Sequence, residues 1–164
     1  MQKPAHFGII AAILSIVLYL ALYSYEKQLI VNPFVKSLRY PIFIGCAWIA
    51  VGRYRHLMED KSVLVSWIRP AFITLVVAST IFTIFEFILF RFVDHDLYQL
   101  SAQYLIEHFP EIQPRGVPGR TNTIEQVTLE EAVSVSRTVF SLAREMVVGF
   151  IVSALIALIW RNKG

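Results

Sequence analysis

The 164-residue chain is 56% hydrophobic and only 16% charged, with a net charge of +3 and a mean hydropathy of +0.59. Soluble domains are roughly 45–50% apolar and about 25% charged, so this composition excludes an ordinary soluble protein. Cys46 is the only cysteine, which excludes an intramolecular disulfide and a cysteine zinc cluster. The apolar residues fall in blocks, and this predicts a polytopic α-helical membrane protein.

The first apolar block, residues 7–25, carries no charge and is long enough to cross a bilayer. A cleaved signal peptide is the alternative, because Lys3 precedes the block. Its apolar core is longer than that of an ordinary signal, however, and no A-x-A cleavage site follows it. The sequence therefore predicts a first transmembrane span at about residues 7–25.

The second apolar block is short. Residues 41–52 are uncharged, but as a helix they cover only about 18 Å. A complete span needs further residues from one side or the other, and Arg39 or Arg53 must then reach the lipid headgroups. The predicted second span covers about residues 38–57.

The third and fourth blocks complete a bundle of four transmembrane helices. Residues 70–90 contain one acid, Glu86, and are bracketed by Arg69 and Arg91. Residues 146–160 are short for a span, but the helical pattern of apolar residues extends further toward the N-terminus. The third and fourth spans are expected at about 70–90 and 139–160, and the whole chain, 1–164, forms one membrane domain.

A polar segment, residues 92–138, lies between the third and fourth spans. Asp94 can cap a helix in which Leu97, Leu100 and Leu105 recur at helical spacing, and Pro110 ends it. The pattern predicts an extra amphipathic helix that lies on the membrane surface or on the bundle.

The distribution of basic residues predicts the orientation in the membrane. Four spans place both termini on one side of the bilayer. The basic residues on that side are Lys3, Arg53, Arg55, Lys61, Arg69, Arg161 and Lys163, against Lys27, Lys36 and Arg39 in the opposite short loop. Because positive charge marks the cytoplasmic side, both termini are expected in the cytoplasm and the polar segment outside.

This orientation gathers charged residues near the outer leaflet. Glu86 is the deepest acid, and Arg39, Arg144 and Glu145 lie at similar depth on the second and fourth spans. A charge at mid-membrane costs roughly 2.5–3.5 kcal/mol, so we expect Glu86 to pair across helices with Arg144 or Arg39. Such a pair can fix the helix register, or it can form a proton, ion or headgroup site built on Glu86.

Asp94, His95 and Asp96 resemble a metal or acid–base cluster, but their spacing argues against one. Adjacent residues of a helix point about 100° apart, so the three side chains cannot converge. Helix capping by the acids, with a surface histidine, is the preferred interpretation. No phosphate loop, nucleophile elbow or other metal-ligand spacing is present, and neither a metal nor a cofactor is expected.

Small residues at four-residue spacing predict close helix packing, within the chain or between copies. They are Gly8 and Ala12 in the first span and Gly149, Ser153 and Ala157 in the fourth. The basic residues 53–56 lie beside a span, which indicates anchoring to anionic headgroups and not nucleic-acid binding.

Five short motifs are distributed over most of the chain: FGII at 7–10, VNPF at 31–34, GRYR at 52–55, VDHDLY at 93–98 and GFIVSALIA at 149–157. With these motifs the sequence resembles an uncharacterised family of small four-span bacterial membrane proteins, known as a domain of unknown function. The resemblance implies four spans and a location in the bacterial inner membrane. It implies no activity and no catalytic residues.

Three functions are compatible with these features. The first is a non-enzymatic accessory or assembly subunit that acts through helix packing and its outer segment, in contact with the bilayer and with a membrane-protein partner or a second copy. The second is a small oligomeric transporter or channel with Glu86 as the coupling carboxylate. The third is a lipid-headgroup enzyme using Asp94, His95 and Asp96 at the outer face. The first is favoured, because the sequence has no catalytic constellation and only one acid well inside a predicted span.

Overall fold

A computed structural model describes residues 3–56, 63–97, 100 and 135–163 of the chain. All the elements in this part of the chain are helical, and it contains no strand. The elements are α1 (Pro4–Tyr25), α2 (Lys27–Val31), α3 (Pro33–Ser37), α4 (Arg39–Tyr54), α5 (Leu64–Ile88), the π-helical turn η1 (Leu89–Val93) and α8 (Val135–Lys163).

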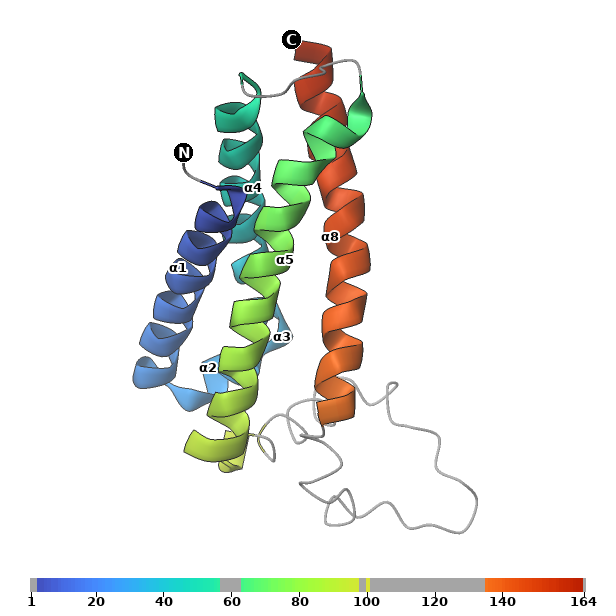
Figure 1. The fold of residues 1–164 in the computed structure, drawn as a ribbon. Coiled ribbons are helices and arrows are strands. Elements are labelled where there is room, and N and C mark those ends of the chain that lie inside the picture. Colours follow the sequence, from blue (N-terminus) through green and yellow to red (C-terminus); the bar gives the residue numbers. More distant parts are fainter. Residues whose placement is uncertain (1–2, 57–62, 98–99, 101–134, 164) are drawn as a thin grey trace.

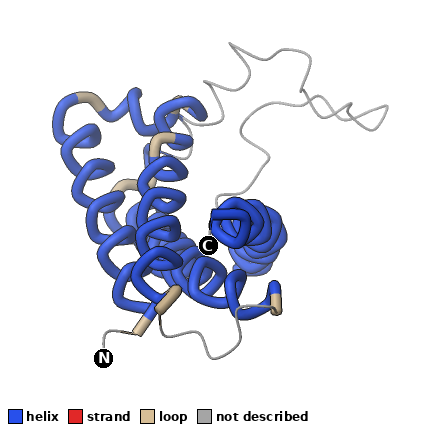
Figure 2. The backbone as a smooth tube through the Cα atoms, turned by 90° about the horizontal axis from the view of Figure 1, so that it is seen from above, coloured by secondary structure: helices blue, strands red, loops and turns tan. Residues whose placement is uncertain are grey.

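The long helices α1, α4, α5 and α8 run alternately up and down, so both termini lie at the same end of the bundle (Figure 1). Helix α5 is central and contacts each of the other three. Viewed along the bundle, α8 stands to one side of the remaining helices (Figure 2). The short helices α2 and α3 connect α1 to α4 at the end opposite the termini.

Four helices in the described part are long and apolar enough to cross a membrane, which confirms the predicted all-α, four-span class. They are Pro4–Tyr25, Pro33–Tyr54, Leu64–Val93 and Thr138–Asn162. Large apolar side chains on their outward faces are exposed, as a lipid-facing surface requires. The predicted amphipathic helix between the third and fourth spans falls almost wholly outside the described residues.

The second span is completed on its N-terminal side. Asn32 caps α3, since its Oδ1 accepts a hydrogen bond from the backbone N–H of Phe34 at 2.9 Å. Pro33 occupies the first helical position, where its missing N–H costs nothing. Leu38 keeps helical backbone angles between α3 and α4, so the two form one span and Arg39 lies inside it.

The third span begins six residues before the predicted start at Pro70, because α5 starts at Leu64 and contains this proline. Proline removes one backbone hydrogen bond, and transmembrane helices tolerate this loss where neighbouring groups compensate. Next to this site, the hydroxyl of Thr74 has one proton to donate, and its oxygen lies 2.8 Å from the carbonyl oxygen of Pro70 and 3.1 Å from that of Pro4. Thr74 thereby ties α5 to the first turn of α1.

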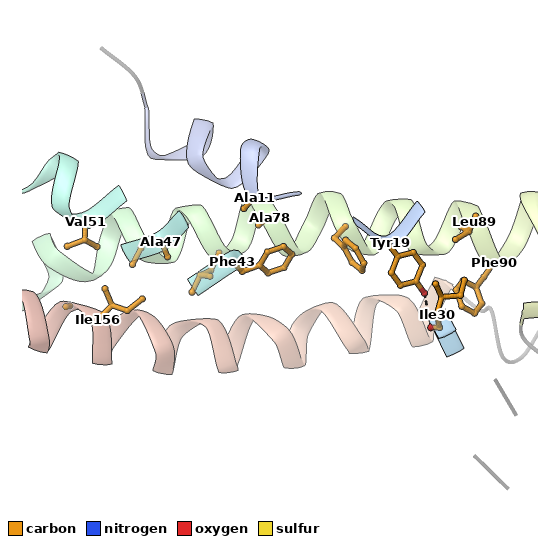
Figure 3. Packing of buried hydrophobic residues seen from close by; sticks show 14 of the residues in the cluster. Ala11, Tyr19, Ile30, Phe43, Ala47, Val51, Ala78, Leu89, Phe90 and Ile156 are labelled. Atoms are coloured by element: carbon orange, nitrogen blue, oxygen red, sulfur yellow. Dashed lines mark hydrogen bonds between the residues drawn. The ribbon is translucent and has the colours of Figure 1, made fainter. Parts of the chain in front are cut away.

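Small residues let α1 and α5 approach closely. Ala11, Ala12 and Ala78 are fully buried, and Ala11 and Ala78 lie next to each other where the two helices cross (Figure 3). A Cβ atom added to Gly8 would lie 2.7 Å from the carbonyl oxygen of Thr74. At this point the backbones of α1 and α5 therefore leave no room for a side chain.

Candidate functional site

Four charged side chains meet inside the bundle near the end opposite the termini. We call Lys36, Arg39, Glu86 and Glu145 the embedded cluster. Lys36 on α3 and Arg39 at the start of α4 are three residues apart in a continuous helical run, so both lie on one face. Glu86 comes from the last turn of α5 and Glu145 from α8. The cluster thus joins three of the four spans.

The ion pairs of the embedded cluster form a chain with Arg39 at its centre. Lys36 Nζ lies 3.1 Å from Glu86 Oε1, and Arg39 Nη1 lies 3.6 Å from Glu86 Oε2. Arg39 Nη2 donates a hydrogen bond to Glu145 Oε1. One guanidinium therefore bridges the carboxylates of two helices. Arginine is suited to this role because its guanidinium presents several N–H donors in one plane.

Aromatic rings hold the two cations of the embedded cluster in place. The guanidinium carbon of Arg39 lies 4.7 Å from the ring centre of Phe82, and Lys36 Nζ lies 4.9 Å from that of Phe90. Phe82 also packs edge-on against Tyr19, whose phenol donates to the carbonyl of Ile30 at 3.3 Å (Figure 3). These contacts stabilise both cations inside the bundle, because a cation is attracted to the face of an aromatic ring.

The embedded cluster is largely shielded from the surface of the bundle. The side chains are 7% exposed in Glu145, 12% in Arg39, 25% in Glu86 and 29% in Lys36. Two acids and two bases carry no net charge, so the set as a whole is far less costly within a membrane span than any member alone.

Two polar atoms of the embedded cluster have no hydrogen-bond partner in the described structure, although both are buried. They are Oε2 of Glu145 and Nε of Arg39. Buried polar atoms are normally paired, so each of these two atoms can take one further partner, and the hydroxyl of Ser79 on α5 is a donor close to Glu145.

A second group of charges, which we call the rim cluster, consists of Tyr23, Lys27 and Asp94. Lys27 Nζ lies 2.6 Å from Asp94 Oδ2, and the phenol of Tyr23 donates to the same oxygen at 2.8 Å. The hydrogen bond from Lys27 holds the pKa of the Asp94 carboxyl below its ordinary value, and the bond from Tyr23 acts in the same direction. The same ion pair raises the pKa of Lys27. The rim cluster links the end of α1 to the end of the third span.

The structure brings only some of the predicted site residues together. Of the two expected partners of Glu86, Arg39 lies within ion-pair distance, whereas Arg144 is exposed and forms no ion pair with Glu86. Arg39 thus turns into the bundle and not toward the headgroups. Asp94 is buried, and His95 and Asp96 are exposed, so these three do not converge. Asp94 Oδ1 instead accepts the backbone N–H of Asp96 at 3.2 Å, as a helix cap does.

The residues predicted to pack helices face the inside of the bundle. Ser153 and Ala157 on α8 and Ala12 on α1 are all fully buried. Gly149 lies opposite Leu75 of α5. A Cβ atom added to Gly149 would be 3.7 Å from the Cβ of Leu75, which is an ordinary van der Waals distance. The hydroxyl of Ser153 donates to the carbonyl of Gly149 at 2.6 Å, which satisfies it within its own helix.

Sequence reasoning missed Lys36, Lys27 and Tyr23 as members of these clusters. Lys36 precedes Arg39 by three residues, a helical spacing that could have indicated a shared face. Lys27 and Tyr23 carried no such signal, since their contact with Asp94 joins residues about seventy positions apart.

No group of three or more histidine, cysteine, aspartate or glutamate side chains that could hold a metal ion occurs in the part of the chain that the structure describes. The embedded cluster combines carboxylates with cations at ion-pair distance. Such an arrangement can hold helices together or exchange a proton, but it lacks an activated nucleophile.

Comparison with known proteins identifies one family. The model of the family described as "Protein of unknown function (DUF4199)" matches residues 6–162. The chain belongs to this family. No curated protein and no solved structure matches the chain. Family membership covers both charge clusters and all four spans, and it assigns none of them a role.

Proposed function

We propose that this member of the family is a non-enzymatic accessory or assembly subunit of a membrane complex. In this proposal four spans form a rigid frame, and the polar segment 92–138 meets a partner at the end that carries the charge clusters. The observation that carries the proposal is the embedded cluster, in which Arg39 joins Glu86 and Glu145 on two other spans. Charges that neutralise one another across helices serve to fix helix register.

The proposal places the protein in the bacterial cytoplasmic membrane with both termini inside. The larger number of basic residues at the end of the termini supports this orientation. The test uses single cysteines in a Cys46→Ala background, Asn162→Cys at one end and Asp96→Cys at the other. An impermeant maleimide should label Asp96→Cys in intact spheroplasts and Asn162→Cys only after permeabilisation. The opposite labelling pattern would refute this orientation.

Glu86→Gln tests whether the embedded cluster holds the bundle together. The substitution keeps the volume but removes the charge that Lys36 and Arg39 share, and we expect it to lower the unfolding free energy by about 1–3 kcal/mol. It should also reduce the amount of any native complex that copurifies. Asp96→Asn is the matched control, because it neutralises an exposed acid outside both clusters.

The unpartnered atoms Glu145 Oε2 and Arg39 Nε favour one second candidate. In a small oligomeric transporter or channel, Glu86 would be the coupling carboxylate, and the open hydrogen-bonding positions would take the proton or the ion. This alternative predicts that Glu86→Gln folds with an unchanged melting temperature. It further predicts that proton or cation flux, present in proteoliposomes of the unaltered protein, disappears in the variant. That combination of results would replace the assembly proposal.

A further inference from the structure

A cavity of about 660 Å³ opens at the end of the bundle that carries the termini. It lies between the start of α1, the last turn of α4 and the first three turns of α5. Its polar lining consists of Lys3, Tyr54, Ser66 and Arg69, and the remaining described residues of its wall are apolar. It is distinct from the embedded and rim clusters, which lie at the opposite end.

Among the described residues that line this cavity, the charged ones are all positive. Lys3 and Arg69 line it, both are exposed, and no acidic residue is among its described lining residues. Neither cation forms an ion pair with another part of the described chain, in contrast to the cations of the embedded cluster. Two cations that no described acid neutralises attract an anion to the cavity beside them.

The cavity also offers an unused hydrogen-bond donor. The hydroxyl oxygen of Tyr54 is buried but has no hydrogen-bond partner in the described structure. Buried polar atoms are normally paired, so this hydroxyl can still form one hydrogen bond. Ser66 adds a second hydroxyl to the lining.

Two helices begin at this cavity, and neither start is capped by a side chain. The cap residue of α1 is Lys3, and that of α5 is Val63. The N–H groups of His6 and Ser66 donate to the carbonyls of these cap residues, and Pro4 has no N–H. The remaining first-turn N–H groups lack intrahelical acceptors and favour an anion. The helix starts therefore add to the attraction that Lys3 and Arg69 exert.

Phosphate is the anion that best matches this set of groups. Arginine and lysine, hydroxyl donors and helix N-termini are the groups that proteins use for phosphate oxygens. The apolar side chains Val65 and Ile73 in the same wall suit the glycerol and upper acyl chains of a phospholipid. We propose that this cavity binds a phosphate group, carried by an anionic lipid headgroup or present as the free ion.

The proposal can be tested with the full-length protein in detergent. Binding of short-chain phosphatidylglycerol is titrated by intrinsic fluorescence or native mass spectrometry, with short-chain phosphatidylcholine as the zwitterionic comparison and inorganic phosphate as competitor. We expect saturable binding of one phosphatidylglycerol with a clear preference over phosphatidylcholine. Competition by millimolar phosphate would identify the free ion as the ligand, whereas binding that phosphate does not displace would identify the lipid headgroup.

Three variants locate the binding in the cavity. Arg69→Gln should weaken it about tenfold, since it removes a charge-assisted hydrogen bond, and Lys3→Gln should act in the same direction. Tyr54→Phe should weaken it about threefold, since only a neutral hydroxyl is lost. Arg161→Gln is the control, because it removes an exposed cation at the same end that does not line the cavity.

The side chains of Lys3 and Arg69 are exposed, so these variants should retain the melting temperature of the unaltered protein. Binding that Arg69→Gln and Tyr54→Phe leave unchanged would overturn the proposal. It would also be overturned if Arg161→Gln caused an equal loss, because this would indicate general attraction of anions to a basic surface.

Discussion

The two ends of the bundle are held together by different forces. At the end of the termini, α1 and α5 approach so closely that a Cβ on Gly8 would meet the backbone of Thr74, and the cations beside the cavity form no ion pair within the described residues. At the opposite end, the embedded and rim clusters join the helices through ion pairs. The difference teaches that the tightest backbone approach and the ion pairs lie at opposite ends of this fold, so each can be disturbed without removing the other.

The largest effect is expected from Arg39→Met, which breaks the charged end. It leaves Glu145 without its cation in a position where the side chain is only 7% exposed, and Glu86 keeps only Lys36. Removing one partner of a buried ion pair destabilises by about 3–5 kcal/mol. Thermal or denaturant unfolding in detergent measures the loss.

Lys27→Met is the matched control for Arg39→Met, because Lys27 is half exposed and its single partner, Asp94, keeps the hydrogen bonds from Tyr23 and from the backbone of Asp96. It should destabilise the protein much less than Arg39→Met. Equal losses in the two variants would contradict the distinction between a buried network and a rim pair.

A second, smaller effect is expected at the packed end from Gly8→Ala. The new methyl group would meet the carbonyl oxygen of Thr74 and the side chain of Val77, so α1 must shift, at a cost of about 1–3 kcal/mol. Gly45→Ala is the matched control, because no atom lies within 4 Å of its added Cβ. It should be neutral or stabilise the helix by up to about 1 kcal/mol. Unfolding measurements that do not separate the two variants would refute close packing at Gly8.

The smallest effect is expected from Asp94→Asn, and it should depend on pH. The pKa of Asp94 is lowered in the folded protein, so its contribution to stability is present above the ordinary aspartate pKa of about 3.9 and is lost as the pH falls through the lowered value. The melting temperature of the variant should therefore lie below that of the unaltered protein near neutral pH, and the difference should shrink in acid.

Lys27 sets the upper limit of the pH range in which this ion pair contributes to stability. Its pKa is raised, so the contribution of the pair persists up to the ordinary lysine pKa of about 10.4 and disappears only above it. If the difference in melting temperature between Asp94→Asn and the unaltered protein increased in acid, this would contradict the ion pair. Asp96→Asn, at an exposed neighbouring position, provides the reference curve.

Local patterns in the sequence were sufficient for the four spans. The resemblance to an uncharacterised four-span family is confirmed by the match over residues 6–162. Helix α1 ends at Tyr25, where the first uncharged stretch ends. Helix α5 begins before Pro70, which looks like a helix start in the sequence but is tolerated within the helix. The side from which the second span is completed could not be decided either, since both flanks have apolar residues.

The sequence by itself determined which charges lie near the membrane and that Glu86 needs a cation, because hydrophobic length and the cost of a buried charge are local properties. Only the tertiary structure decided that this cation is Arg39 and not Arg144, and that Arg39 also bridges to Glu145. That choice depends on which helix faces turn toward α5, and long-range packing sets those faces. The cavity between Lys3, Tyr54 and Arg69 has the same origin, since three helix ends must meet before it exists.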